Sequence, residues 1–160
     1  MTALVEGRDD DFKKEWERFD YKKFWNFERP WREVILAHGT STIGSVAMDA
    51  DGRFAVCNST GGSSPMLRGR VGDSPIIGCG YYAGKHAAIA ATGIGEAIVE
   101  KFLCRTVHDW IEAGLPLQQA LDRGVALFPE EISVGLIGVS RDAVGAASNR
   151  PMPWHGLEAG

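Results

Sequence analysis

The sequence lacks a long hydrophobic run. No apolar stretch approaches the ~20 residues that cross a bilayer as a helix, and the opening MTALVEGRDDD has no apolar stretch of the kind found in signal peptides. Basic residues are also few: 17 lysines and arginines are scattered among 21 acidic residues, for a formal net charge of -4. This distribution offers no footprint for nucleic acid. We therefore expect a cytoplasmic protein whose partner is a small molecule or peptide, with no role for nucleic acid or membrane.

Cysteine is scarce, and its three copies form neither an even disulfide set nor a CxxC pair: Cys57, Cys79 and Cys104. This favours a reducing compartment and argues against structural zinc. The four histidines show neither metal-ligand spacing nor the context of a base for a serine or cysteine nucleophile: His38, His86, His108 and His155. His108 has the sequence surroundings of an ordinary surface residue. We expect neither a metal nor a cofactor.

At 160 residues and 44% hydrophobic content, the chain can form one ordinary globular domain. Residues 9–29 place aromatic residues among charged ones at nearly helical spacing, which predicts an amphipathic helix ended by Pro30. Residues 33–41 have no clear period and then become rich in small and hydroxyl residues, which is typical of a linker. Because the composition changes at Thr42, we divide the chain into residues 1–41 and 42–160.

Beyond residue 42 the sequence predicts strand pairs and helices in turn. A hairpin is expected over residues 43–59 with its turn at Asp51-Gly52, followed by a long exposed loop over the glycine-rich residues 60–74. Two short buried strands are expected next, at residues 75–84 and 86–92. Two consecutive helices follow, of which the first ends at Gly114 and the second begins at Pro116. Two further strands are expected at residues 133–140 and 144–149. This order predicts an α+β fold in which an antiparallel sheet is covered by helices.

The first predicted helix follows a strand and Gly93-Ile94-Gly95, which superficially matches a dinucleotide-binding turn. The third glycine position falls on the bulky Ile98, and a second helix follows where a strand is required, so we set this interpretation aside. The apolar stripe of the helix consists of Val99, Phe102, Val107, Trp110 and Ile111. The glycines remain candidate backbone donors to a developing oxyanion.

The remaining candidates for chemistry are threonines and an ion-pairing set. Thr42 opens a strand and Thr60 closes the next one, while Arg70 and Asp73 lie in the glycine-rich loop. Each has an ordinary interpretation, because the threonines could be plain strand residues and the charged pair a surface salt bridge of little energetic value. The segment RGRVGDSP between two strand pairs favours a functional interpretation.

Four segments together resemble the N-terminal nucleophile hydrolases of the isoaspartyl peptidase and plant-type asparaginase group, to which glycosylasparaginases are related. These segments are TIGSVAMDADG, the STGG of residues 59–62, GRVGDSPIIGCGYYAG and AATGIGEAI, and they follow the family's order. The resemblance covers roughly two thirds of the chain, from Thr42 to about Asn149. It implies an αββα sandwich, of which this chain would hold only part.

The resemblance also implies roles for individual residues. Autocleavage between Ser41 and Thr42 would give Thr42 a free α-amine, so that one residue supplies nucleophile and base. Thr60 would orient the nucleophile, while Arg70 and Asp73 would hold the substrate's α-carboxylate and α-ammonium. The Thr92 hydroxyl and the Gly93 N–H would form the oxyanion hole, and Gly93 would also contact substrate. The expected reaction is hydrolysis of the side-chain amide of asparagine or a β-aspartyl peptide through a β-aspartyl ester.

The sequence departs from the family in two places. Ser41 stands where the family usually has aspartate or glycine, and only about forty residues stand in place of the large N-terminal subunit. A complete enzyme would be a dimer of processed heterodimers, so we expect the missing strands to come from another chain or from sequence before Met1. Glycosylasparaginase activity is the alternative reaction, although STGG favours the asparaginase branch. A truncated, inactive binding fragment is the alternative of another class.

Overall fold

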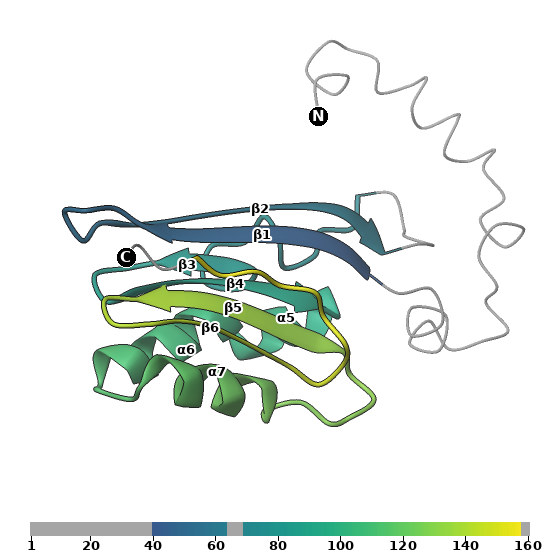
Figure 1. Ribbon diagram of the computed structural model, residues 1–160. Coiled ribbons are helices and arrows are strands. Elements are labelled where there is room, and N and C mark those ends of the chain that lie inside the picture. The colour runs from purple at the N-terminus through teal and green to yellow at the C-terminus, as the bar shows by residue number, and fades with distance from the viewer. Residues whose placement is uncertain (1–39, 64–68, 158–160) are drawn as a thin grey trace, which may run out of the picture. The chain divides into compact units, whose positions relative to one another are not determined.

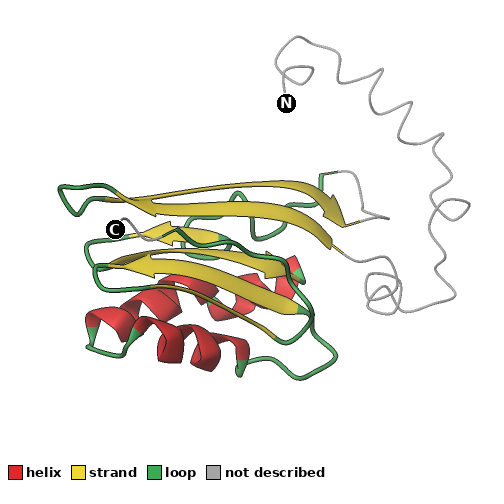
Figure 2. Ribbon diagram, in the orientation of Figure 1, coloured by secondary structure: helices red, strands yellow, loops and turns green. Residues whose placement is uncertain are grey.

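The computed structural model describes residues 40–63 and 69–157, which form two antiparallel sheets and a layer of helices (Figures 1 and 2). The predicted α+β class and antiparallel pairing are confirmed. The amphipathic helix expected at residues 9–29 lies outside the described residues, as does most of the expected linker. The last two residues of that linker, Thr40 and Ser41, are already strand. No helix among the described residues is long and apolar enough to cross a membrane.

The first sheet is a hairpin of β1 (Thr40–Met48) and β2 (Phe54–Ser63). Its turn lies where the sequence predicts it. The Asp49 carboxylate accepts hydrogen bonds from the backbone N–H groups of Asp51 and Arg53 at 3.0 and 2.8 Å, and Gly52 adopts a φ of +75°. A left-handed φ is easy for glycine, so this residue lets the chain reverse without strain.

The second sheet has the strand order β3-β4-β5-β6, and every neighbouring pair is antiparallel. Its strands are β3 (Tyr81–Ala83), β4 (Ala87–Gly93), β5 (Val134–Ser140) and β6 (Val144–Ser148). Residues 87–91 of β4 are all buried, because the strand is covered on both faces. Its run of small apolar residues is the composition expected of such a strand.

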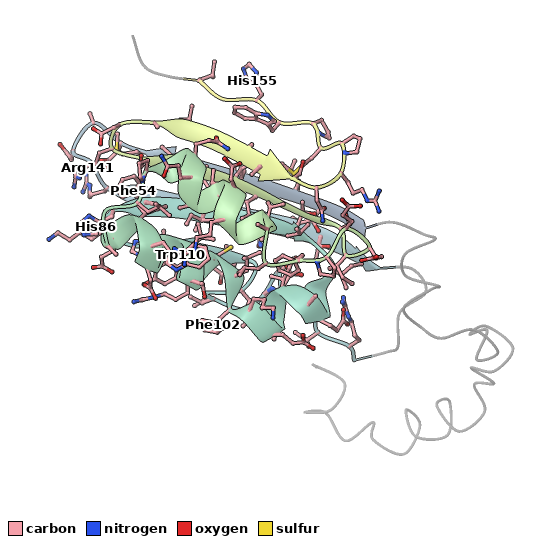
Figure 3. The ribbon with its side chains drawn as sticks, turned by 90° about the horizontal axis from the view of Figure 1, so that it is seen from below. Phe54, His86, Phe102, Trp110, Arg141 and His155 are labelled. Carbon is pink, nitrogen blue, oxygen red and sulfur yellow. The ribbon has the colours of Figure 1, made fainter. Side chains whose placement is uncertain are left out.

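The hairpin lies over the second sheet, with β1 and β2 facing β4 (Figure 1). Small residues let the two sheets approach closely. A Cβ placed on Gly44 would stand only 2.9 Å from the Cβ of Ala90, which is inside normal van der Waals contact. At the turn end, the Arg141 guanidinium lies 6.0 Å from the centre of the Phe54 ring, and both are labelled in Figure 3. The two sheets therefore meet both at Gly44 and at the turn end of the hairpin.

Three helices cover the other face of the second sheet (Figure 2): α5 (Gly95–Lys101), α6 (Leu103–Glu112) and α7 (Leu117–Val125). The apolar core lies between these helices and the sheet. Its largest fully buried side chains are Ile89, Ile98, Leu103, Leu121 and Leu136. Gly114, with a φ of +97°, lies just beyond the end of α6, where a left-handed residue ends a helix without strain.

The single helix predicted before Gly114 is wrong, because Phe102 divides it into α5 and α6. Phe102 has a φ of +48° and is 49% exposed, so it does not belong to a buried stripe. Its ring lies over Gly78, where a Cβ would come within 2.6 Å of the ring. The break frees N–H groups at the start of α6, and the Arg105 N–H donates to the Gly78 carbonyl at 2.9 Å. The helix is therefore interrupted at Phe102, and the contacts of Phe102 and Arg105 with Gly78 take the place of the hydrogen bonds lost within the helix.

The strand predicted at residues 75–84 is also wrong over its first six residues, which form turns. The carbonyl of Asp73 accepts from the N–H groups of Ile76 at 2.9 Å and Gly80 at 3.1 Å, which folds the segment back on itself. The expected exposed loop over residues 60–74 is wrong at both ends. Strand β2 continues to Ser63, and Asp73 and Ser74 are buried at 6% exposure each.

Candidate active site

Two threonine hydroxyls meet at one end of the hairpin. Thr42 on β1 lies opposite Thr60 on β2, and its Oγ1 donates a hydrogen bond to the Thr60 Oγ1 at 3.1 Å. The Thr60 Oγ1 also accepts from the Gly62 N–H at 3.0 Å. The hydrogen bond from Gly62 thus orients the Thr60 hydroxyl, and the Thr60 hydroxyl orients the side chain of Thr42. The sequence prediction that Thr60 orients Thr42 is compatible with this geometry.

The pairing of the two strands becomes irregular at the bond before Thr42. Thr42 pairs with Thr60, but Ser41 pairs with Gly62, so Gly61 has no opposite residue. Gly62 adopts a φ of +77°, which glycine tolerates. An extra residue of this kind is a β-bulge, which bends the strand and changes the direction of nearby side chains. The distortion therefore falls at the peptide bond that the sequence analysis predicts to be cut.

Arg70 is held by a carboxylate that the sequence analysis did not select. Its Nε donates to Glu96 Oε1 at 2.6 Å and its Nη2 to Glu96 Oε2 at 2.7 Å, in a two-point pairing. The Arg70 side chain is 18% exposed and the Glu96 side chain 36%. This hydrogen bonding raises the pKa of Arg70 and lowers the pKa of Glu96. The guanidinium plane is therefore fixed in the folded chain before any ligand arrives.

Asp73 is buried beside this pair. Burial raises the pKa of its carboxyl, and its Oδ2 has no hydrogen-bond partner among the described residues. Gly95 makes the arrangement possible, because a Cβ there would lie 2.8 Å from Asp73 Oδ1 and 2.9 Å from Arg70 Nη2. A buried carboxylate with an unsatisfied oxygen favours a ligand that brings a positive charge or a donor.

Gly93, at the end of β4, lies at the same cavity as Arg70 and Asp73. Its φ of +142° and the adjacent Ser133 carbonyl leave no room for a side chain. Thr92, its neighbour on β4, pairs with Gly135 and is half-buried. Gly93 lies at the cavity that holds the threonines, whereas Thr92 is not among the residues that line it.

One cavity of about 220 Å³ joins these groups, and its lining includes Thr42, Thr60, Arg70, Asp73, Gly93 and Gly95. Five of the residues selected from the sequence thus come together from β1, β2, the loop that follows β2 and the end of β4. Glu96, in the segment AATGIGEAI, was not selected from the sequence, whereas Gly95 had been kept as a candidate backbone donor. The position of this glutamate in the first turn of the predicted helix, after two glycines, was the only available signal.

The competing nucleophiles lie elsewhere. Cys79 and Cys104 are fully buried, and burial raises the pKa of both thiols, so neither presents a reactive thiolate. The expectation that His108 is an ordinary surface residue is wrong: it is 2% exposed, because α6 turns it against Tyr82. His155 is exposed, away from the helix layer (Figure 3). No described histidine lines the threonine cavity.

Comparison with known proteins identifies the family of the chain. The sequence profile of the family described as "Asparaginase" matches residues 3–153. An isoaspartyl peptidase/L-asparaginase of Danio rerio is 39% identical over 124 residues, covering 74% of this chain and 40% of the relative. A plant-type L-asparaginase of Pyrococcus abyssi is 34% identical over 147 residues, covering 86% of this chain and 48% of the relative.

A probable isoaspartyl peptidase/L-asparaginase 2 of Arabidopsis thaliana is 41% identical over 107 residues, covering 66% of this chain and 33% of the relative. In each of these three comparisons the matched segment is less than half of the relative's length. The match over nearly the whole of this sequence nevertheless settles its ancestry. The chain belongs to the asparaginase family.

Proposed function

We propose that this chain is the catalytic segment of a threonine amidohydrolase that cleaves the side-chain amide of L-asparagine or of β-aspartyl peptides. The observation that carries the proposal is the Thr42–Thr60 hydroxyl pair at 3.1 Å in a cavity that also contains Arg70 and Asp73. A nucleophile and a binding set for an amino-acid head group then share one space. Family membership supports the same reaction class.

The first step is cleavage of the Ser41–Thr42 bond. The Thr42 hydroxyl attacks the Ser41 carbonyl carbon, the acyl group moves from nitrogen to oxygen, and water hydrolyses the resulting ester. The β-bulge at this bond supports the step, because it departs from regular strand pairing where the bond must be approached. Cleavage releases an α-amine whose ordinary pKa, about 7.7–8.0, suits a base near neutral pH.

Hydrolysis of substrate then uses the same hydroxyl. The Thr42 amine takes the proton of Oγ1, the oxygen attacks the side-chain carbonyl carbon, and the amine passes the proton to the leaving nitrogen. The Gly93 N–H, at the cavity, would stabilise the oxyanion. The resemblance adds the Thr92 hydroxyl, which would have to turn towards the cavity to take part. Water cleaves the β-aspartyl ester and regenerates the threonine. The products are aspartate and ammonia or an amine.

The head group of the substrate would be held by charge. Arg70, fixed by Glu96, would bind the α-carboxylate, and Asp73 would bind the α-ammonium. The ammonium would supply the partner that the buried Asp73 Oδ2 lacks among the described residues. Both groups together select a free aspartyl end over an internal residue of a protein.

The catalytic segment would work with a second, N-terminal segment or chain. Strands β1 and β2 are the whole of the first sheet among the described residues, so the outer edges of both are unpaired there. Edges of this kind are usually covered or paired. We propose that the partner adds strands at these edges and that the complete enzyme is a dimer of such heterodimers, in the cytoplasm.

The decisive measurement is the intact mass of the purified chain after incubation, compared with Thr42→Ala and with Ser45→Ala. Ser45 is a matched control, because it is an exposed hydroxyl on the same strand. We expect a new chain starting at Thr42 from the parent and from Ser45→Ala only. If all three proteins stay whole, this chain is an inactive fragment of its family and the proposal fails.

Substrate choice is tested with the cleaved protein. L-Asparagine, a β-aspartyl dipeptide and N-acetylglucosaminyl asparagine are offered in parallel, and released aspartate is measured. We expect turnover of the first two, with kcat/KM rising as the Thr42 amine loses its proton near pH ~8. Turnover of the glycosylated compound alone would favour the glycosylasparaginase reaction.

A further inference from the structure

A second group of polar side chains lies at the other end of β4. It comprises His108, Asp109 and Glu112 on α6, and His86 in the turn before β4. Strand β4 separates this turn from Gly93 by about 20 Å, at ~3.3 Å per residue over its length. The group is therefore independent of the threonine cavity, and its role does not rest on the proposed function.

His108 is the unusual member. It is 2% exposed, yet neither ring nitrogen has a hydrogen-bond partner among the described residues. The Tyr82 ring packs edge-on against it at 4.9 Å between centroids, but the Tyr82 hydroxyl accepts from Arg105 at 2.5 Å. On another side the imidazole Nε2 abuts Gly84, where a Cβ would clash with it. A buried imidazole without partners calls for a ligand or a compensating contact.

The neighbouring side chains direct further donor atoms to this imidazole. The Asp109 Oδ1 lies 3.8 Å from the His108 Nδ1, and one ligand atom each from His108, Asp109 and Glu112 lie within 4.8 Å of one another. The His86 Nε2 lies 3.8 Å from the Glu112 Oε1, and the two imidazole centroids are 6.3 Å apart. Figure 3 shows His86 at the periphery of the molecule, where solvent can deliver an ion.

We propose that His108, His86 and Glu112, with Asp109 as the fourth ligand, form a binding site for a zinc-type divalent cation. Two imidazoles and two carboxylates are a donor set that suits Zn²⁺ in a closed, four-coordinate site. Bonds of ~2.0–2.2 Å in a tetrahedron place ligand atoms about 3.4 Å apart, so the group must contract slightly. The exposed ends can move, because the side chains of His86, Glu112 and Asp109 are 38%, 51% and 48% exposed.

The bound cation would join α6 to the turn between β3 and β4. One ligand comes from the turn and three come from the last part of the helix, so the ion would act as a cross-link between the helix layer and the sheet. The Arg105 Nε already pairs with Asp109 Oδ1 at 2.7 Å, so Arg105 would compete with the cation for this carboxylate. His86 and Glu112 are therefore the better positions for substitution. The sequence shows no such motif because residues 86 and 108 are far apart in the chain.

The test is equilibrium dialysis of the full chain against Zn²⁺ alone, with His86→Gln, Glu112→Gln and His155→Gln measured beside it. His155 is the matched control, since it is an exposed histidine in the C-terminal segment. We expect one Zn²⁺ per chain, an affinity lowered on the order of 100-fold by loss of His86 or Glu112, and no change from His155→Gln. Both test positions lie at the surface, which protects the fold. Equal affinity in all four proteins would overturn the proposal.

Cobalt gives a second readout that identifies the ligands. Co²⁺ in place of Zn²⁺ should show the visible bands of tetrahedral nitrogen and oxygen coordination, and these bands should disappear in Glu112→Gln. A sulfur-to-cobalt charge-transfer band would instead place the ion on the exposed Cys57 and would contradict the site. Zn²⁺ should also raise the Tm of the parent but not that of His86→Gln. These readouts do not depend on cleavage at Thr42, so each proposal can fail alone.

Discussion

The two sheets of this molecule differ in how completely they are buried. The second sheet has the helix layer on one face and the hairpin on the other, and residues 87–91 of its strand β4 have almost no exposed surface. The first sheet is only half-buried on its inward face, where Gly44 and Val46 alternate with exposed neighbours. On its outer face Ile43 is 72% exposed. Among residues 40–63 and 69–157, the second sheet is therefore closed, with both faces covered, and the first sheet is open on its outer face.

This difference bears on what the chain can do alone. The threonine pair lies on the open sheet, whereas Gly93 and Gly95 lie on or beside the closed one. The candidate active site is therefore assembled across the two. Stability should come mainly from the closed sheet and its helices, and the position of the nucleophile should depend on the hairpin. Substitutions in each region can test this division.

The largest effect is expected in the closed half. Leu136 on β5 is fully buried in the helix-facing core, so Leu136→Ala should lower the free energy of unfolding by about 3 kcal/mol through lost burial and an unfilled cavity. Urea unfolding followed by circular dichroism measures the change. A loss below about 1 kcal/mol would mean that this core is not the main source of stability.

A smaller loss is expected at the contact between the sheets. Gly44→Val places a branched side chain where even a Cβ would stand 2.9 Å from Ala90. Overpacking of this kind typically costs about 1–3 kcal/mol. The matched control is Ser45→Val, because Ser45 points to the exposed outer face of the same strand. Equal unfolding curves for the two variants would show that the sheets do not pack as closely as Gly44 and Ala90 indicate.

In the segment that joins the two sheets, one substitution, Asp73→Asn, should raise the free energy of unfolding at neutral pH. Burial raises the pKa of Asp73 in the folded chain, so folding disfavours its ionised form. Wild type and Asp73→Asn should be equally stable below the unfolded pKa of about 3.9, and the variant should become the more stable as pH rises through the folded pKa. Urea unfolding at pH 3 and pH 7 measures the two differences. A less stable variant at pH 7 would mean that the charge has a partner.

The closed half was also the more predictable from sequence. Strands β5 and β6 follow their local patterns, and their bounds were found within one residue. Helix α7 begins at Leu117, one residue after the expected start at Pro116. The errors at Phe102 and residues 75–80 have one cause. In both places hydrogen bonds that the periodicity does not reveal decide the backbone. The Gly78 carbonyl accepts from the distant Arg105 N–H, and the Asp73 carbonyl accepts from the N–H groups of Ile76 and Gly80 in its own turn.

The candidate site was predictable from a resemblance and only weakly from single residues. Thr42, Thr60, Arg70 and Asp73 came from motifs, and the cavity unites them. Glu96 was missed because its role depends on reaching Arg70, 26 residues away. The burial of His108 was missed for a related reason, since the side chains around it come from α6 and from the β3–β4 region. The catalytic roles, the cleavage and the cytoplasmic location remain predictions.

The smallest effect should come from the outer face of the hairpin. Because Ile43 is 72% exposed, Ile43→Ser should change the free energy of unfolding by less than about 0.5 kcal/mol. Val46→Ser is the matched variant, since Val46 is half-buried on the inward face of the same strand, and it should lose about 1–3 kcal/mol.

The same pair of variants tests whether this face belongs to a partner. If the proposed N-terminal segment covers it, adding that segment as a separate chain should make Ile43→Ser costly, while the cost of Val46→Ser stays nearly constant. A loss above about 1 kcal/mol for Ile43→Ser in the chain alone would mean that some part of this sequence already covers the face. In that case another segment of the same chain covers the outer face, and no partner is needed to close the first sheet.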